Sequence, residues 1–254
     1  AHGWVTLYSN DFEAGLGDWS ISAGVWEVGV PTAGTNSADG GSNCAGTVLG
    51  GNYPSDADRR LSSTPITLQT VTGSEELRLR FWHWFSYSSY DAGYIQVSVY
   101  DSANATWSDW VTKGSWDDSF GEWTLGDIDL TEYAGKKVKL GFYHIANGPY
   151  ESTGWYIDDI EIVKGTPVFS GDFESGQGDW IVDKVVWEVG APTAGPGSVH
   201  GGSSCAGTVL GGNYPASLDS RLISPPVTLP VAGPDGEVQL RFWHWFSYSS
   251  YDAG

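Results

Sequence analysis

The chain contains two copies of one sequence unit, and the second copy ends before the first one does. Asp11-Phe12-Glu13 returns as Asp172-Phe173-Glu174, and residues 81–93 return unchanged as residues 242–254. Matching residues are always 161 positions apart, so no insertion or deletion separates the copies. Roughly two aligned positions in three are identical, which indicates a tandem array. Chains built in this way more often display, link or assemble than catalyse.

A unit of 161 residues is long enough to bury its own hydrophobic core and is close to the common domain size. The sequence therefore predicts whole domains: a leading segment at residues 1–7, a first domain at 8–163, a linker at 164–167 and a second domain at 168–254. The second domain is incomplete, because it lacks the equivalent of residues 94–163. The linker is short and contains Gly165 and Pro167, so the domains are expected to be close neighbours.

The composition and the spacing of turn residues indicate an all-β protein. Gly (35), Trp (14) and Tyr (13) are abundant, and short strand-like runs alternate with turn signals. The expected strands include residues 77–85, 94–100, 137–143 and 155–163. This many short strands predicts two-sheet sandwiches.

The run at residues 77–85 alternates strongly between two kinds of side chain. One face is expected to carry Leu77, Leu79, Phe81, His83 and Phe85, and the other Arg78, Arg80, Trp82 and Trp84. We therefore expect the first face to lie in a core and His83 to be a core histidine.

The charge balance excludes some classes of partner. The chain has 31 acidic and 12 basic residues, for a formal net charge of −19. Phosphate binding needs a Lys/Arg surface, so nucleic acid is not an expected partner. No apolar run approaches the roughly 18 residues of a membrane span, so membrane insertion is not expected either. The chain has no Met, not even at position 1, which favours a processed start with any signal peptide removed.

The order of motifs resembles a known family. Residues 11–19 contain Asp-Phe-Glu-x-Gly followed by Trp, a Gly/Ser-rich loop ends in Gly51-Asn52-Tyr53, and the Leu-x-Phe-Trp-His strand follows at residues 79–83. Residues 129–136 then contain Asp-Leu with Tyr-Ala-Gly-Lys, and residues 155–160 read Trp-Tyr-Ile-Asp-Asp-Ile. This order is similar to the MAM-type and "choice-of-anchor" jelly-roll modules of secreted bacterial proteins, which also follow secreted peptidases and resemble concanavalin-like lectins. The resemblance implies all-β, tandem two-sheet antiparallel jelly-roll sandwiches outside the cell or at its surface. It does not dictate an activity.

The resemblance also implies a structural Ca²⁺ ion that joins the opening strand of a domain to its closing strand. Carried over to this sequence, the ligands are Asp11 and Glu13 from the opening motif, Asp39 or Asn43 from the Gly-rich loop, and Asp159 from the closing strand. In the second copy Asp172 and Glu174 persist, but His200 and Ser204 replace the two loop residues. Ca²⁺ takes six to eight oxygen ligands, so His200 is a poor replacement. The alternative is that Asp11 and Glu13 cap a turn while Asp158 and Asp159 face water.

A set of aromatic residues forms the second candidate site. Sugars present apolar C–H faces that stack on aromatic rings, while nearby polar groups bind the hydroxyls. The candidates are Trp26, Trp82, Trp84, Tyr87 and Tyr90, with Trp243 and Trp245 in the second copy. An exposed surface of this kind fits a glycan or the next unit of the array. The alternative is ordinary packing in the core of the sandwich.

The sequence gives little support for catalysis. It has no His-Glu-x-x-His, no Gly-x-Ser-x-Gly and no phosphate-binding loop. Residues 127–132 have the spacing of the Glu-x-Asp-x-x-Glu motif of laminarinase-type hydrolases, with Asp127, Asp129 and Glu132 as the carboxylates. The first residue of the motif is Asp here instead of Glu, however. Its shorter side chain would hold the carboxylate further back, so no catalytic residue is expected.

Three further residues are candidates for cross-linking or covalent modification. Cys44 and Cys205 are the same position in the two copies, so one unit cannot form an internal disulfide. Each is either a small buried hydrophobic residue or a cross-link between units. Asn104 opens a single N-glycosylation sequon, Asn-Ala-Thr.

The incomplete second copy suggests that several chains associate. Residues 94–163 and 164–254 together make one full period. A neighbouring molecule can therefore complete the second domain by strand donation, joining copies head to tail into an open filament. The alternatives are a longer array and a disordered tail.

The sequence thus predicts a non-enzymatic, extracellular, tandem lectin-like β-sandwich protein that is stabilised by Ca²⁺. Its expected role is surface adhesion or service as a repeating subunit of an extracellular matrix fibre, with copies of itself and glycans as partners. The alternative function is that of a carbohydrate-binding accessory region of a secreted hydrolase or peptidase. A glycoside hydrolase acting through Asp127, Asp129 and Glu132 is the third hypothesis.

Overall fold

The computed structural model of the protein describes residues 4–22, 24–184, 186–217, 219–231 and 238–249. The chain divides into two compact units, Ala1–Pro167 and Val168–Gly254, and each is described separately. The described residues contain strands, turns and one 3₁₀-helix, Thr131–Tyr133, and no α-helix. No helix in this part of the chain has the length and hydropathy needed to cross a membrane.

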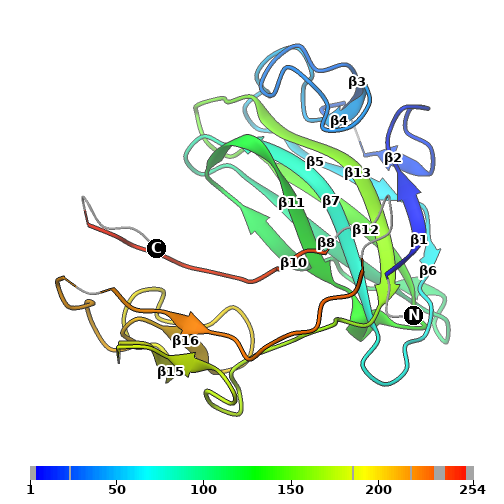
Figure 1. Ribbon diagram of the computed structural model, residues 1–254. Helices are drawn as coiled ribbons and strands as arrows, with labels where there is room; N and C mark the ends of the chain where they lie inside the picture. Colours follow the sequence, from blue (N-terminus) through cyan, green and yellow to red (C-terminus); the bar gives the residue numbers. More distant parts are fainter. Residues whose placement is uncertain (1–3, 23, 185, 218, 232–237, 250–254) are drawn as a thin grey trace. The chain divides into compact units, whose positions relative to one another are not determined.

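Unit 1 contains two antiparallel sheets that lie in two layers (Figure 1). The six-stranded sheet has the order β11 (Ser119–Asp129), β7 (Glu76–Ser86), β13 (Gly154–Gly165), β4 (Cys44–Gly46) and β3 (Glu27–Gly29), with β1 (Val5–Asn10) paired to β13. The seven-stranded sheet has the order β10 (Val111–Trp116), β8 (Ala92–Asp101), β12 (Lys137–Ile145), β5 (Asp58–Ser63) and β2 (Trp19–Ile21), with β6 (Ile66–Thr67) on β12 and β9 (Thr106–Trp107) on β8. The expected all-β class and antiparallel sandwich are confirmed in this unit.

The strongest sequence pattern produces the central strand of the six-stranded sheet. Along β7 every second residue is buried, and the buried set is the one expected from Leu77 to Phe85. Across the core these side chains meet those of the other sheet: the rings of Phe81 and Phe142 are 4.9 Å apart, edge to face. The period-2 alternation of a strand with one buried face explains why residues of this pattern form β7.

Trp155 lies at the centre of the core. It is fully buried, and its ring packs against those of Trp26, Trp116 and Phe142 at centroid distances of 5.4–6.0 Å. Its Nε1–H donates to Nδ1 of His83 at 3.2 Å. Burial lowers the pKa of His83 to about 3, so this ring is neutral and can accept the bond. The expectation that His83 is a core histidine agrees with this geometry.

The N-terminal strand begins earlier than the expected domain boundary at residue 8. β1 starts at Val5, which pairs with Lys164 of β13. The pairing extends the domain at both ends, because β13 itself continues to Gly165, inside the expected linker. Backbone hydrogen bonds between the first and last strands of the unit therefore join segments more than 150 residues apart in the sequence.

Unit 2 contains short pieces of the same arrangement. β14 (Ile181–Val182) pairs with β17 (Leu222–Ile223), and β15 (Glu188–Gly190) pairs with β16 (Cys205–Gly207). Both pairs keep the register of their counterparts in unit 1, where β2 pairs with β5 and β3 with β4. Short pieces of the fold are thus specified by local sequence.

The described part of unit 2 does not form the second two-sheet sandwich that the repeat leads one to expect. Residues 242–248 are identical in sequence to residues 81–87 of unit 1, yet they lie outside any strand, and Phe242, Trp243 and Phe246 are exposed. In unit 1 the same sequence lies between β11 and β13, which bond to both of its edges. The difference shows that neighbouring strands, rather than the residues alone, decide the state of this segment.

Candidate functional site

Two groups of residues in unit 1 have features of a site: the acidic residues around loop 34–43, and an aromatic surface on the seven-stranded sheet. The acidic group depends on a β-bulge in β13. Asp158 lies opposite Trp82 of β7, and Glu161 lies opposite the next outward position, Arg80, so one extra residue is inserted between them. Asp159, within the bulge, has a φ of 44°. Bulges bend a strand and redirect its side chains, and here they bring two successive carboxylates to the loop.

Asp158 holds this loop through the backbone. Its side chain is fully buried, and Oδ2 accepts hydrogen bonds from the backbone N–H groups of Asp39 (3.0 Å) and Gly40 (3.2 Å). Oδ1 accepts the N–H of Asp159 at 2.9 Å. Burial raises the pKa of the Asp158 carboxyl to about 7. The alternative that Asp158 faces water is therefore wrong, and the contribution of Asp39 to this contact comes from its backbone.

Glu13 holds the other half of the loop. Its Oε1 accepts the N–H groups of Ser42 and Asn43, both at 2.7 Å, and the Asn43 amide lies 3.4 Å from Oε2. The second copy repeats this clamp, since Glu174 Oε1 accepts the N–H groups of Ser203 and Ser204. Glu13 and Glu174 are thus loop anchors in both copies, a role that was not expected from the sequence.

The opening aspartates cap a turn in both copies. Asp11 Oδ1 accepts the N–H of Glu13 at 3.1 Å, and Asp172 Oδ1 accepts that of Glu174 at 3.0 Å. This agrees with the turn-cap alternative for Asp11. It does not exclude a second role, because a carboxylate has lone pairs for more than one contact.

The expected cation ligands of unit 1 lie near one another. Burial, followed by the charges of Asp11, Glu161 and Glu13, raises the pKa of Asp159. Burial and the charge of Asp159 raise the pKa of Asp39. A Cβ built on Gly40 would lie 2.6 Å from Asp159 Oδ2, and one on Gly41 would lie 2.5 Å from Glu13 Oε1, so both carboxylates lie directly against the loop.

The donor chemistry of this group suits a hard cation, with one restriction. Among the described residues, Asp11, Glu13, Asp39 and Asp159 make no ion pair with Lys, Arg or His. Within the same residues, no three His, Cys, Asp or Glu side chains converge closely enough to hold a metal ion by themselves. An ion at this position would therefore need backbone carbonyl or water oxygens beside the carboxylates, which Ca²⁺ accepts readily.

The aromatic residues expected to form one surface are divided between the core and two outer positions. Trp26 and Tyr87 are buried in the core, so their place in an exposed site is wrong. Trp82 and Trp84 are half-buried on the outer face of β7, and Trp84 packs edge to face on Tyr156 at 5.5 Å. Tyr90 is exposed in the turn after β7. In unit 2, Trp243 and Trp245 are exposed, and Trp243 stacks on His200 at 3.8 Å.

A different aromatic surface lies on the outer face of the seven-stranded sheet. Its members come from β8, β9, β12 and the residue before β10; we call it the aromatic strip, and it comprises Tyr94, Tyr100, Trp107, Trp110 and Tyr143. All five side chains are half-buried. In β8 and β12 they alternate with inward-facing core residues, which include Ile95 and Phe142. This face was not recognised as a site from the sequence.

Cations hold the aromatic strip in place. The guanidinium of Arg60 lies between the rings of Trp110 and Tyr143, 4.5 Å from each centroid. Lys139 Nζ lies 4.4 Å from the centroid of Trp107, and Lys137 Nζ lies 5.0 Å from that of Tyr100. Cation–π contacts of this kind favour a defined ring orientation.

Gly141 makes room for this arrangement. A Cβ at this position would lie 2.6 Å from Cδ of Arg60 and 2.9 Å from Cζ3 of Trp110, closer than real Cβ contacts. The glycine therefore allows the arginine and the indole to lie flat against β12. The rings are fixed by backbone and cation contacts before any ligand arrives.

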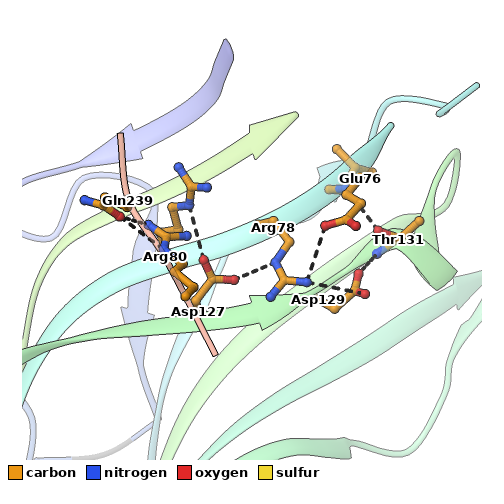
Figure 2. Close-up of polar contacts among 9 residues, drawn as sticks. Glu76, Arg78, Arg80, Asp127, Asp129, Thr131 and Gln239 are labelled. Atoms are coloured by element: carbon orange, nitrogen blue, oxygen red, sulfur yellow. Dashed lines mark hydrogen bonds and ion pairs between the residues drawn. The ribbon is translucent and has the colours of Figure 1, made fainter. Parts of the chain in front are cut away.

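The three carboxylates of the hydrolase-like motif are engaged in ion pairs, and Figure 2 shows those of Asp127 and Asp129. Asp127 lies between Arg78 and Arg80 and is paired with both. Asp129 pairs with Arg78 at 3.5 Å and accepts the N–H of Thr131 at 2.7 Å. Glu132 pairs with Lys113. All three carboxylates are therefore held by cations of the same unit, an arrangement that fits structural ion pairs.

The modification candidates differ in accessibility. Cys44 is fully buried, and burial raises the pKa of its thiol to about 12, while Cys205 is half-buried. In the folded unit Cys44 is therefore the small buried hydrophobic residue of the two alternatives. Asn104 is exposed between β8 and β9, and its Nδ2 donates to Asp101 Oδ2 at 2.6 Å.

No family model matches the chain, so membership of the MAM-type or choice-of-anchor modules stays a prediction. Over 156 residues the chain is 33% identical to Bacillopeptidase F of Bacillus subtilis (strain 168). The match covers 60% of the chain and 10% of that protein. Because it spans about a tenth of the relative's length, the relative's activity does not follow for this chain.

Solved structures with partial similarity include two carbohydrate-binding modules and an adhesin domain. TmCBM61 in complex with β-1,4-galactotriose is 19% identical with a TM-score of 0.39, covering 60% of this chain and 92% of that one. A xylan-binding domain from CBM 22 is 14% identical with a TM-score of 0.43, covering 65% and 97%. The K2 cleaved adhesin domain of Lys-gingipain is 16% identical with a TM-score of 0.41, covering 61% and 96%. Similarity this low says nothing of the ligand of the present chain.

Proposed function

We propose that the chain is an extracellular glycan-binding β-sandwich protein whose binding surface is the aromatic strip. The observation that carries the proposal is a row of five half-buried rings on the outer face of one sheet, held by three cations and seated over Gly141. Apolar sugar faces stack on such rings, and glycan sites combine them with a few fixed polar groups. Gln96 and Thr112 supply such groups here, linked by a hydrogen bond of 3.2 Å.

The proposal replaces the surface expected from Trp82 and Trp84 by one on the opposite sheet. It agrees with the alternative function stated from the sequence, a carbohydrate-binding accessory region of a secreted hydrolase or peptidase. Binding, rather than catalysis, is the role proposed, because the hydrolase-like carboxylates are paired with Arg78, Arg80 and Lys113.

Replacing a single ring of the strip by alanine should weaken glycan binding strongly. We expect Trp110→Ala and Tyr143→Ala each to weaken binding to the best glycan on an array by about 30-fold, since a central aromatic hot spot contributes about 2 kcal/mol. The melting temperature should change little, because both rings are on an outer face. Isothermal titration calorimetry of the full chain measures the affinity.

The matched control for this test is Trp82→Ala, which removes a half-buried ring from the outer face of the other sheet. It should bind glycan like the parent protein. If Trp82→Ala loses binding and Trp110→Ala keeps it, the site lies on the six-stranded sheet and the proposal is wrong.

We also propose that a Ca²⁺ ion stabilises unit 1 at the loop that residues 34–43 form. Support comes from the uncompensated carboxylates of Asp11, Asp39 and Asp159, which lie at the end of β1, in the loop and in the bulge of β13. An ion there would offset the repulsion among these carboxylates, which adds to burial in raising the pKa of Asp159, and would link the first strand of the unit to the last. The experiment that tests this proposal opens the Discussion.

A second candidate function is adhesion through association of chains. The chain carries two copies of one unit in tandem, and strand addition to a sheet edge is a common route by which such units associate. We propose that copies of the chain join head to tail into an adhesive or matrix fibre. Negative-stain microscopy of the concentrated protein with calcium should show filaments, whereas a single monomeric species in sedimentation at the same concentration would contradict the proposal.

A further inference from the structure

We propose that the aromatic strip selects acidic glycans, polysaccharides whose sugars carry carboxylate groups. The inference rests on the proposed glycan-binding function and adds the class of ligand. It starts from the distribution of charge. The chain has 12 basic against 31 acidic residues, yet three of its cations, Arg60, Lys137 and Lys139, lie on the outer face of β5 and β12 among the rings.

None of these three cations pairs with an acid in the described part of the chain. The ion pairs there involve other basic residues: Arg78, Arg80, Lys113, Lys164 and Lys184. The three charges gather on one face among the rings, and a local cluster of positive charge attracts anions.

Arg60 is held by neutral groups only. Its Nε and Nη2 donate to Oε1 of Gln96 at 3.2 and 2.8 Å. Gln96 Nε2 in turn donates to Thr112 Oγ1, which fixes the orientation of the amide. The guanidinium is thus preorganised between two rings with no carboxylate hydrogen-bonded to it among the described residues, and burial lowers its pKa.

The remaining edge of this guanidinium is where a carboxylate can bind. No described residue bonds to Nη1 of Arg60. Arginine recognises carboxylates through charge-assisted hydrogen bonds, and its flat faces stack on aromatic rings at the same time. A sugar carboxylate at this edge would leave the sugar ring beside Trp110 or Tyr143.

The acid that faces this group is Asp58, which precedes the Arg59-Arg60 pair in β5. Its charge acts on Arg60 and on the Tyr143 hydroxyl. Against this carboxylate stand the three cations Arg60, Lys137 and Lys139. Lys137 and Lys139 are two residues apart on β12, which places their stems about 7 Å apart along the strand. Lys139 is in turn about 13 Å from Tyr143, the cross-strand partner of Arg60. Positive charges spaced along one face suit a polysaccharide that carries a carboxylate at regular intervals.

The test compares matched acidic and neutral glycans on the full chain. The probes are oligogalacturonate, glucuronoxylan and hyaluronate oligosaccharides, each beside its carboxyl-reduced form, which keeps the linkages and removes the charge. We expect at least one acidic member to bind tenfold or more tightly than its reduced form. The advantage should shrink when NaCl is raised from 50 to 500 mM.

Variants then assign the effect to the cations. Arg60→Gln and Lys139→Gln should each remove most of the acidic preference, with Lys184→Gln of unit 2 as the control that keeps it. Arg60→Gln also removes the guanidinium from between Trp110 and Tyr143 and can disturb these rings. Lys139→Gln leaves them in place, because Lys139 contacts Trp107 instead. Equal binding of reduced and acidic forms overturns this inference and leaves the glycan-binding function standing. Absence of binding to every glycan, neutral or acidic, overturns both.

Discussion

Removal of calcium should lower the melting temperature of the protein by about 5–10 °C. A ligand present at 100 times its Kd stabilises a protein by about 2.7 kcal/mol. For a domain of this size each kcal/mol corresponds to about 2–4 °C. The physical origin is the group of carboxylates from Asp11, Asp39 and Asp159, which repel one another when no cation is present. Differential scanning calorimetry with calcium and with a chelator measures the shift.

Asp159→Asn should raise the melting temperature of the calcium-free protein and remove most of its response to calcium. The amide keeps the shape of the side chain, and Asn tolerates the left-handed φ of 44° at this position. Without calcium the variant should melt at a higher temperature than the parent, because one of the repelling charges is gone. With calcium it should gain little, because a ligand is gone as well.

The control for this variant is Asp117→Asn, which removes one exposed acid between β10 and β11 and leaves the loop intact. It should keep the full response to calcium. Identical melting of the parent protein with calcium and with chelator would falsify the calcium proposal. The glycan-binding proposal would survive that result, since the aromatic strip shares no residue with the acidic group.

Trp155→Ala should cost about 3–5 kcal/mol of unfolding free energy, a large part of the stability of a domain. The substitution leaves a cavity among Trp26, Trp116 and Phe142 and removes the donor to His83. The midpoint of urea unfolding should fall steeply while its slope stays the same.

Trp107→Ala is the matched control, because this Trp is half-buried on an outer face. Its cost should be well under that of Trp155→Ala. Equal losses for the two variants would show that Trp155 does not have the central place in the core that the geometry gives it.

The alternating strands could be predicted from the sequence because one residue pattern determines them. Residues 77–85, 94–100, 137–143 and 155–163 all lie inside observed strands, β7, β8, β12 and β13. The buried face of β7 was also predicted correctly. In β7, β8 and β12 a face in the core leaves its period in the sequence, whereas the bulge interrupts that period in β13.

The candidate site was predicted only in part, for reasons of long-range geometry. Trp26 lies outside any strand, where no period separates core from surface, whereas Tyr87 continues the buried face of β7 and could have been assigned to the core from the same period. The burial of Asp158 comes from loop 34–43, whose backbone N–H groups it binds although they lie 118 and 119 residues away in the sequence, so it leaves no local signal. Glu13 binds backbone N–H groups some thirty residues away, and contacts of that kind leave no side-chain pattern.

The aromatic strip had a signal that was present but faint. Tyr94, Gln96, Ser98 and Tyr100 alternate with apolar residues in β8, and Lys137, Lys139, Gly141 and Tyr143 do the same in β12. The same face analysis that succeeded for β7 would have separated them. What the sequence could not supply is the pairing of these strands, or the position of Arg60 between rings from two other segments.

The extra residue in β13 has a consequence for changes in chain length. Before the bulge the inward residues are Trp155 and Ile157, at odd positions, and after it they are Ile160 and Ile162, at even positions. Deletion of Asp159 alone would remove the bulge and leave a regular strand, with Ile160 opposite Phe81 and both isoleucines still facing the core. Loss of this single residue would therefore remove a proposed cation ligand without changing which side chains of the last strand face inward.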